Sequence, residues 1–356
     1  MARITTPVTV VTGFLGAGKT TLINRILREA HGQRLAVIEN EFGAVGVDAE
    51  FLVTDKDETV IQLANGCLCC TVRGDLARAL NDLAQKADGG AFAFDRVLIE
   101  TTGLADPGPV IQTFLAETAI LTRFHLDGVV TLVDAVHGLG QLVQVESRAQ
   151  IAYADRLLLT KCDLAAPAAQ DELSERLAAM NPRARMLPVD LQRGDLRQVL
   201  ALLFDARAYS FDHVAPEEIA RMRTRRIDLL RPAGSTKLLP AGAAVHTDDV
   251  VSCVFESEEA IDLDRLNVFL DAAMQRFGPR LWRCKGIVHA AFQRQRLVVQ
   301  GVKTLLQING GSVWRAYESR RTVLVFIGQG LDRRWILDAL RMCEVTFTPQ
   351  PPQHLQ

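Results

Sequence analysis

The chain has no excess of charge of either sign and no hydrophobic run long enough to cross a membrane. Its 40 lysines and arginines nearly balance 42 aspartates and glutamates, which gives a net charge of −2 at pH 7. This balance provides no electrostatic case for nucleic acid as a partner. No apolar run approaches the roughly 20 residues that span a bilayer, and the polar residues before the first apolar stretch are too few for a signal peptide. We therefore expect a soluble, cytoplasmic protein that has no membrane partner.

A disulfide pattern is also missing. The sequence has only seven cysteines, and three of them, Cys67, Cys69 and Cys70, lie within four positions. This crowding differs from the spread of cysteines in a disulfide framework, so we expect the thiols to be reduced.

A glycine-rich loop between a predicted strand and a predicted helix comes early in the chain. A short apolar run precedes Gly13–Thr21, and apolar residues recur at helical spacing after it. The order strand, loop, helix is the context that the P-loop pattern G-x-x-x-x-G-K-T requires. Gly13, Gly18, Lys19 and Thr20 fill that pattern. The segment therefore predicts a site for a nucleoside triphosphate.

Each residue type in this loop has a physical role at a triphosphate. Glycines let backbone N–H groups turn toward phosphate oxygens, and the helix N-terminus adds its own N–H groups and dipole. Lys19 can reach the β- and γ-phosphates, and the Thr20 hydroxyl can ligate Mg²⁺. The residues predicted to bind the nucleotide here are Gly13, Gly16, Ala17, Gly18, Lys19, Thr20 and Thr21.

An acidic residue and a glycine follow a later apolar run. Glu100 comes directly after Arg96–Ile99, and Gly103 lies three residues further on. In a P-loop protein an acid at a strand end holds Mg²⁺ or its water, and a glycine here lets the backbone approach the γ-phosphate. We therefore predict that Lys19, Glu100 and Gly103 form the catalytic set. A carboxylate that caps the helix near Pro107 is the alternative.

The last long apolar run of the first 200 residues ends in the tetrapeptide TKCD at Thr160–Asp163. Asp163 can accept hydrogen bonds from both N1–H and N2–H₂ of guanine, while the stem of Lys161 lies along the base. The familiar pattern is N-K-x-D, and Thr160 in place of asparagine removes one amide contact. The tetrapeptide therefore favours GTP and leaves adenine open. An aspartate that caps the following helix is the alternative.

Cys67, Cys69 and Cys70 form the pattern C-x-C-C between a predicted strand and a predicted helix. Thiolates are soft ligands that select Zn²⁺ and Cu(I), and Co²⁺ or Ni²⁺ stay open as alternatives. Three ligands leave a fourth position free, which suits the transfer of a metal better than a closed structural site. Packing of buried free cysteines is the alternative.

The apolar pattern divides the chain in two. Short apolar runs alternate with helical patterns up to about residue 206, which predicts an α/β domain with a doubly wound, mostly parallel sheet. A linker is expected over 207–247. From 248 to 345 strand patterns are combined with two helices, which predicts a second, smaller α+β domain. Residues 346–356 form the expected tail.

Within the second domain, helices are predicted over Leu263–Phe277 and Asp332–Cys343. One of the predicted strands covers Ile287–Phe292.

These motifs together resemble the CobW-like family of P-loop GTPases, which is related to GTPases that insert nickel into hydrogenase and urease. The resemblance covers most of the chain. The matching segments are GFLGAGKTTL at Gly13–Leu22, IENEFG at Ile38–Gly43, NGCLCC at Asn65–Cys70, E-x-x-G at Glu100–Gly103, TKCD at Thr160–Asp163, and Lys285-Gly286, Gln300-Gly301 and Val325–Gly328.

The resemblance implies a P-loop GTPase domain over 1–206 and a CobW-type C-terminal domain over 248–345. It implies GTP hydrolysis with Mg²⁺, binding of Zn²⁺ or Co²⁺ at C-x-C-C, and delivery of the metal to a client protein. It also implies a switch segment that contacts Mg²⁺ or the carried metal, which adds Glu39, Glu41 and Asp48 to the metal candidates beside Thr20.

The chain departs from the family pattern in two ways. Many relatives carry another acid after the glycine of ENEFG, where this chain has Ala44, and cobalt-associated members often carry a histidine-rich tract, which is missing here. Ala44 means that a metal ligand is absent at that position, and the missing tract weakens cobalt and storage functions and leaves zinc as the first choice. We therefore expect a GTP-hydrolysing metallochaperone for zinc.

Two other functions stay open at this point. A P-loop kinase of a small metabolite would use Lys19 and Glu100 but gives C-x-C-C no role. A GTP-gated binding module would use the cysteines only as structure. The sequence leaves open the client protein, the physiological metal and its fourth ligand, and the oligomeric state, a homodimer included.

Overall fold

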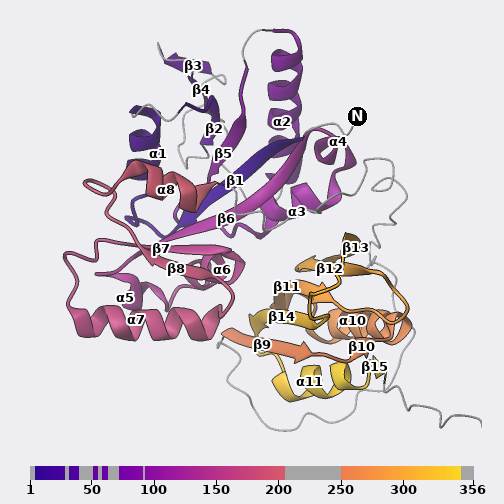
Figure 1. Ribbon diagram of the computed structural model, residues 1–356. Helices are drawn as coiled ribbons and strands as arrows, with labels where there is room; N and C mark the ends of the chain where they lie inside the picture. Colours follow the sequence, from indigo (N-terminus) through magenta and orange to yellow (C-terminus); the bar gives the residue numbers. More distant parts are fainter. Residues whose placement is uncertain are drawn as a thin grey trace, which may run out of the picture. The chain divides into compact units, whose positions relative to one another are not determined.

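The computed structural model describes two parts of the chain (Figure 1). The described residues are 5–28, 32–39, 51–54, 58–62, 72–90, 93–204 and 250–345. They divide into two compact units, one up to residue 204 and one from residue 250. The predicted linker over 207–247 and the tail over 346–356 lie outside the described residues, so the domain boundaries stay predictions.

The first unit is built on a single sheet, in which the described residues contribute eight strands. The strand order is β3-β4-β2-β5-β1-β6-β7-β8, and every neighbouring pair is parallel except β3 with β4. Strands are added on both sides of β1, which confirms the predicted doubly wound sheet. The strands are β1 (Thr6–Gly13), β2 (Leu35–Glu39), β3 (Phe51–Thr54), β4 (Glu58–Gln62), β5 (Arg96–Glu100), β6 (Phe124–Asp134), β7 (Arg156–Thr160) and β8 (Arg185–Pro188).

Helices cover both faces of this sheet. Successive residues of a buried strand point to opposite faces, so each central strand contributes to two cores. Leu158 of β7 belongs to the core that α1 and α8 share with the sheet. Its neighbours Leu157 and Leu159 belong to the core on the other face, under α6 and α7. The helices are α1 (Lys19–Arg28), α2 (Val72–Asp88), α3 (Gly108–Ala116), α4 (Thr118–Leu121), α5 (Gly138–Gln141), α6 (Val145–Tyr153), α7 (Pro167–Met180) and α8 (Leu196–Leu203).

The second unit is an antiparallel sheet with helices against one face, which confirms the predicted smaller α+β domain. Its described strands form a five-stranded sheet in the order β13-β12-β11-β14-β9 and a two-stranded sheet of β10 and β15. Phe269 of α10 packs edge-on against Phe326 of β14, with ring centroids 5.7 Å apart. The elements are β9 (Val250–Ser257), β10 (Ala260–Ile261), α10 (Leu263–Phe277), η1 (Gly278–Arg280), β11 (Leu281–Val288), β12 (Gln295–Val302), β13 (Leu305–Val313), β14 (Thr322–Gln329), α11 (Arg333–Arg341) and β15 (Glu344–Val345).

The predicted helix over Leu263–Phe277 has the same bounds as α10. The Asp262 carboxylate caps it by accepting hydrogen bonds from the backbone N–H groups of Asp264 and Arg265, both at 3.0 Å. A residue that caps a helix in this way marks its start in the sequence.

The strand predicted over Ile287–Phe292 is wrong in its bounds. The structure instead has β11 at Leu281–Val288. Arg283 and Lys285 obscured this strand, because they interrupt its apolar residues in the sequence. Phe292 has φ +61°, a conformation that ends an extended strand.

None of the described helices is both long enough and apolar enough to cross a bilayer.

Candidate functional site

The loop between β1 and α1 has backbone conformations that require glycine. Gly13 has φ +145°, and a Cβ placed on it would lie 2.4 Å from the carbonyl oxygen of Leu132. Gly18 has φ +101°, where a Cβ would lie 2.6 Å from a methyl carbon of Leu191. A side chain is therefore excluded at Gly13 by conformation and by the Leu132 backbone, and disfavoured at Gly18 by conformation. This is the compact turn that a phosphate-binding loop needs.

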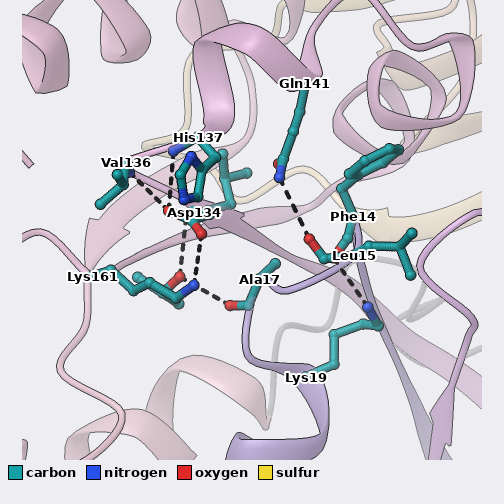
Figure 2. Close-up of polar contacts among 11 residues, drawn as sticks. Phe14, Leu15, Ala17, Lys19, Asp134, Val136, His137, Gln141 and Lys161 are labelled. Carbon is teal, nitrogen blue, oxygen red and sulfur yellow. Dashed lines mark hydrogen bonds and ion pairs between the residues drawn. The ribbon is translucent and has the colours of Figure 1, made fainter.

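The Lys19 side chain folds back over this loop (Figure 2). Its Nζ donates to the carbonyl oxygens of Gly13 at 2.7 Å and Phe14 at 3.2 Å, and the residue is only 8% exposed. Burial lowers the pKa of Lys19, and the nearby charge of Glu100 opposes that shift. The structure thus places a cation at the centre of the loop, where phosphate oxygens could replace the carbonyl partners.

Thr20 and Glu100 lie side by side at the start of α1 and the end of β5. The Thr20 hydroxyl donates to Oε1 of Glu100 at 3.0 Å, and Glu100 is 8% exposed. A hydroxyl and a carboxylate are the hard oxygen ligands that Mg²⁺ prefers. The two residues therefore fit a shared magnesium site next to Lys19.

The segment after Glu100 is held against the P-loop. The backbone N–H of Thr101 donates to Val11 O at 3.0 Å, and its hydroxyl donates to that of Thr12 at 2.7 Å. A Cβ placed on Gly103 would lie 2.8 Å from the backbone nitrogen of Leu15. Only glycine allows so close an approach between these two backbones.

Thr160 contacts the P-loop from the end of β7. Its hydroxyl donates to the carbonyl oxygens of Ala17 at 2.9 Å and Val133 at 3.3 Å, and the residue is fully buried. The threonine side chain is therefore engaged with backbone rather than turned toward open space. Asp163, three residues later, is exposed.

Lys161 forms an ion pair with Asp134, the last residue of β6 (Figure 2). The Lys161 Nζ lies 2.7 Å from Asp134 Oδ2, and Oδ1 accepts hydrogen bonds from the backbone N–H groups of Val136 and His137. Burial of Asp134 tends to raise its pKa, but these hydrogen bonds outweigh it and hold the pKa below its usual value. Lys161 also has φ +58°, so its backbone is held in a conformation uncommon for lysine.

The candidate metal ligands Cys67, Cys69, Cys70, Glu41 and Asp48 lie outside the described residues. Glu39 ends β2 and lies in register beside Glu100 of β5. Within the described part of the chain, no cluster of three or more histidine, cysteine or acidic residues could hold a metal ion.

The described cysteines behave as packing residues. Burial raises the pKa of Cys253 and of Cys343 to about 11 in each case. The pKa of the Cys162 thiol is also raised, first by burial and then by the charge of Asp163. A thiol that stays protonated is a poor metal ligand.

Three residues at this site had no role in the sequence-based prediction. Asp134 holds Lys161, the Gln141 side chain donates to Leu15 O at 3.4 Å (Figure 2), and Gln150 binds the segment that contains Gly103. An acid directly after the apolar run Val129–Val133 was a usable signal for Asp134. The two glutamines carry no local signal, because their partners are far away in the sequence.

Comparison with known families gives two matches in chain order. Residues 7–188 match the CobW/HypB/UreG nucleotide-binding domain, and residues 250–344 match the cobalamin synthesis protein cobW C-terminal domain. The two matched segments correspond to the two described units.

Individual relatives match nearly the whole chain. The zinc chaperone YjiA of Escherichia coli is 39% identical over 322 residues, which cover 90% of this chain and 93% of the relative. The zinc chaperone CobW of Pseudomonas aeruginosa is 32% identical over 94% of this chain and 90% of its own length. The crystal structure of Zn(II)-bound YjiA GTPase from E. coli matches with a TM-score of 0.71 and 35% identity, over 96% of this chain and all of that one.

The P-loop geometry, the two domain matches and the full-length relatives agree with one another. The chain belongs to the CobW/HypB/UreG family and is a P-loop GTPase of that family.

Proposed function

We propose that this GTPase is a zinc metallochaperone, which carries Zn²⁺ on Cys67, Cys69 and Cys70 and delivers it to a client protein under the control of GTP. Relatives that cover most of the chain are named zinc chaperones, and the E. coli relative was solved with Zn(II) bound. These names support zinc as the cargo.

The observation that carries this proposal is the register of three adjacent strands. Gln62 of β4 pairs with Glu39 of β2, and Glu39 pairs with Glu100 of β5. The chain leaves β4 at Gln62, five residues before Cys67 in the sequence, at a point about 10 Å from Glu100, two strand spacings away. This short separation in sequence from a strand end beside Glu100 supports a coupling between the γ-phosphate and the three cysteines.

The nucleotide chemistry follows from the described residues. In this proposal Lys19 binds the β- and γ-phosphates, while Thr20 and Glu100 hold Mg²⁺, which neutralises charge on the phosphates when bound. Gly103 lets the backbone approach the γ-phosphate, and Asp163 reads the guanine base.

In this proposal the switch between the two sites is the segment from Glu39, the last residue of β2, to Asp48. Glu39, Glu41 and Asp48 would contact Mg²⁺ or the carried metal when GTP is bound. In other GTPases the γ-phosphate orders the switch segments. If it orders the cysteine loop here in the same way, zinc binding no longer costs the entropy of bringing the thiolates together. We expect the GTP state to bind zinc more tightly than the GDP state.

The experiment is a zinc titration of the reduced protein against a competing chelator at fixed pH, with no nucleotide, with GDP and with a slow GTP analogue. A coupling free energy in the usual range of 1–3 kcal/mol predicts that zinc binds roughly 5- to 150-fold more tightly with the analogue than with GDP. Linkage requires that zinc raise the affinity for the analogue relative to that for GDP by the same factor. Binding should also release protons, because the thiols must ionise to ligate.

Two variants separate the outcomes. The triple variant Cys67→Ala, Cys69→Ala, Cys70→Ala should lose tight zinc binding, whereas the control Cys162→Ala should keep it. Equal zinc affinity with GDP and with the analogue would contradict the GTP-controlled delivery mechanism, and only the GTPase activity would stand. If the triple variant binds zinc as tightly as wild type, the three cysteines have a structural role and do not carry the metal.

A further inference from the structure

A buried glutamine binds the segment that follows Glu100. Gln150 lies on α6 and is 1% exposed. Its side-chain Nε2 donates to the carbonyl oxygens of Gly103 and Ala105, both at 3.0 Å. Both N–H groups of one carboxamide are therefore used on the backbone between β5 and α3, 45 to 47 residues away in the sequence.

These bonds act on the part of the segment that touches the P-loop. Gly103 lies against Leu15, where a Cβ would come within 2.8 Å of the Leu15 nitrogen. A glycine backbone has more accessible conformations than any other residue, so an unrestrained Gly103 could leave this position at little cost. Hydrogen bonds to the carbonyls of Gly103 and Ala105 remove much of that freedom.

We infer that Gln150 is a positioning residue for GTP hydrolysis: it holds the backbone of Gly103 at the γ-phosphate end of the P-loop and so makes the site favour GTP over GDP. This inference rests on the role of Gly103 at the γ-phosphate in the proposed function. Gln150 does not contact the nucleotide itself. It acts by fixing the segment in advance, so binding GTP does not have to order it.

A second buried amide, Asn181 at the end of α7, binds the backbone of α6 and offers a contrast. Asn181 donates from Nδ2 to the carbonyl oxygens of Ile151 and Ala154 at 2.8 Å each, at the C-terminal end of α6. It stabilises the helix without touching the segment after Glu100. If Gln150 only stabilised the fold, removing its amide would affect nucleotide binding no more than removing the amide of Asn181.

The test is Gln150→Met, which keeps the length of the side chain and removes both donors. We expect kcat for GTP to fall by about 10- to 100-fold. Affinity for a non-hydrolysable GTP analogue should fall by about 10-fold, while affinity for GDP changes by less than about 2-fold, because GDP lacks the phosphate that Gly103 meets. Gln150→His keeps one donor and should give intermediate values, and it serves as well if the methionine variant does not fold.

Two controls remove contacts of similar burial. Thr131→Val deletes the hydroxyl that donates to the carbonyl oxygen of Gln150 itself at 2.8 Å, and Asn181→Leu deletes the other amide. Both should lower stability and leave the preference for the GTP analogue over GDP unchanged. The inference is overturned if Gln150→Met keeps that preference and its kcat, or if the controls lose them equally.

A further variant distinguishes this inference from the role of Gly103. Gly103→Ala places a methyl group against Leu15 and should lose the preference for the GTP analogue. If Gly103→Ala has no effect, the γ-phosphate role of Gly103 falls. If only Gln150→Met has no effect, the positioning role alone falls. All these measurements are made without zinc, so their outcome is independent of the zinc titration that tests the chaperone proposal.

Discussion

The hydroxyl of Thr160 donates a hydrogen bond of 2.9 Å to the carbonyl oxygen of Ala17, which joins the end of β7 directly to the P-loop. The same strand end carries the TKCD motif, so one threonine links the segment expected at the base to the segment expected at the phosphates. Thr160, which stands where the familiar pattern has asparagine, thus binds the P-loop backbone although it lacks the amide that would contact the base.

Thr160→Val should weaken GTP and GDP alike by a few-fold, because the P-loop loses a tether and Ala17 loses a buried donor. Stability should fall by about 1–3 kcal/mol, the usual cost of an unsatisfied buried group. Nucleotide titration and urea unfolding measure the two effects. Thr113→Val is the control, since that hydroxyl donates to Pro109 O inside α3. Unchanged nucleotide affinity in Thr160→Val would show that the tether does not support the loop.

Lys19→Ala should abolish GTP turnover and weaken GTP binding. The ammonium is the cation that the structure places on the loop carbonyls, so its removal costs a charge-assisted hydrogen bond worth about 1.5–3 kcal/mol, roughly a 10- to 150-fold loss of affinity. Calorimetry with a GTP analogue gives the affinity, and phosphate release gives the turnover. Near-normal affinity in a correctly folded variant would rule out the P-loop assignment.

Asp163→Asn should reduce GTP affinity and improve binding of xanthosine triphosphate. The carboxylate is expected to accept hydrogen bonds from guanine, whereas xanthine presents a carbonyl at C2 that needs a donor, which an amide supplies. Competition between the two nucleotides on wild type and variant measures the switch. If GTP affinity is untouched, the guanine site lies elsewhere.

Asp134→Asn should remove a pH-dependent part of the stability. The pKa of Asp134 is lowered in the folded protein, so its ionised form stabilises the fold above the unfolded pKa, and this contribution is lost as the pH falls through the folded pKa. We expect wild type to be more stable than the variant by about 1–3 kcal/mol at pH 7, with the difference shrinking as the pH falls below about 4. Urea unfolding of both proteins between pH 3 and 7 measures this. A difference that does not vary with pH would contradict the ion pair with Lys161.

Much of the first unit was predictable because its signals are local. The strand before Gly13, the turn of the P-loop and the helix from Lys19 follow one another directly, so periodicity and glycine spacing identify them together. The second unit was harder at β11, where charged residues interrupt the apolar pattern, and at β13, where the pair Gly310-Gly311 lies inside a strand. Strands that are buried on both faces of a parallel sheet read as continuous apolar runs, whereas antiparallel strands with one exposed face mix apolar and polar residues.

The sequence by itself determined the phosphate loop, the strand-end acid Glu100, the doubly wound class and the resemblance to a metallochaperone family, because each depends on residue types at short, fixed spacings. Only the tertiary structure decided which side chains meet across long separations. Lys161 pairs with Asp134, Thr160 reaches Ala17, and Gln150 holds Gly103, all through the order in which parallel strands assemble. That order brings strand ends together at one edge of the sheet, and no local pattern of residues records which of them become neighbours.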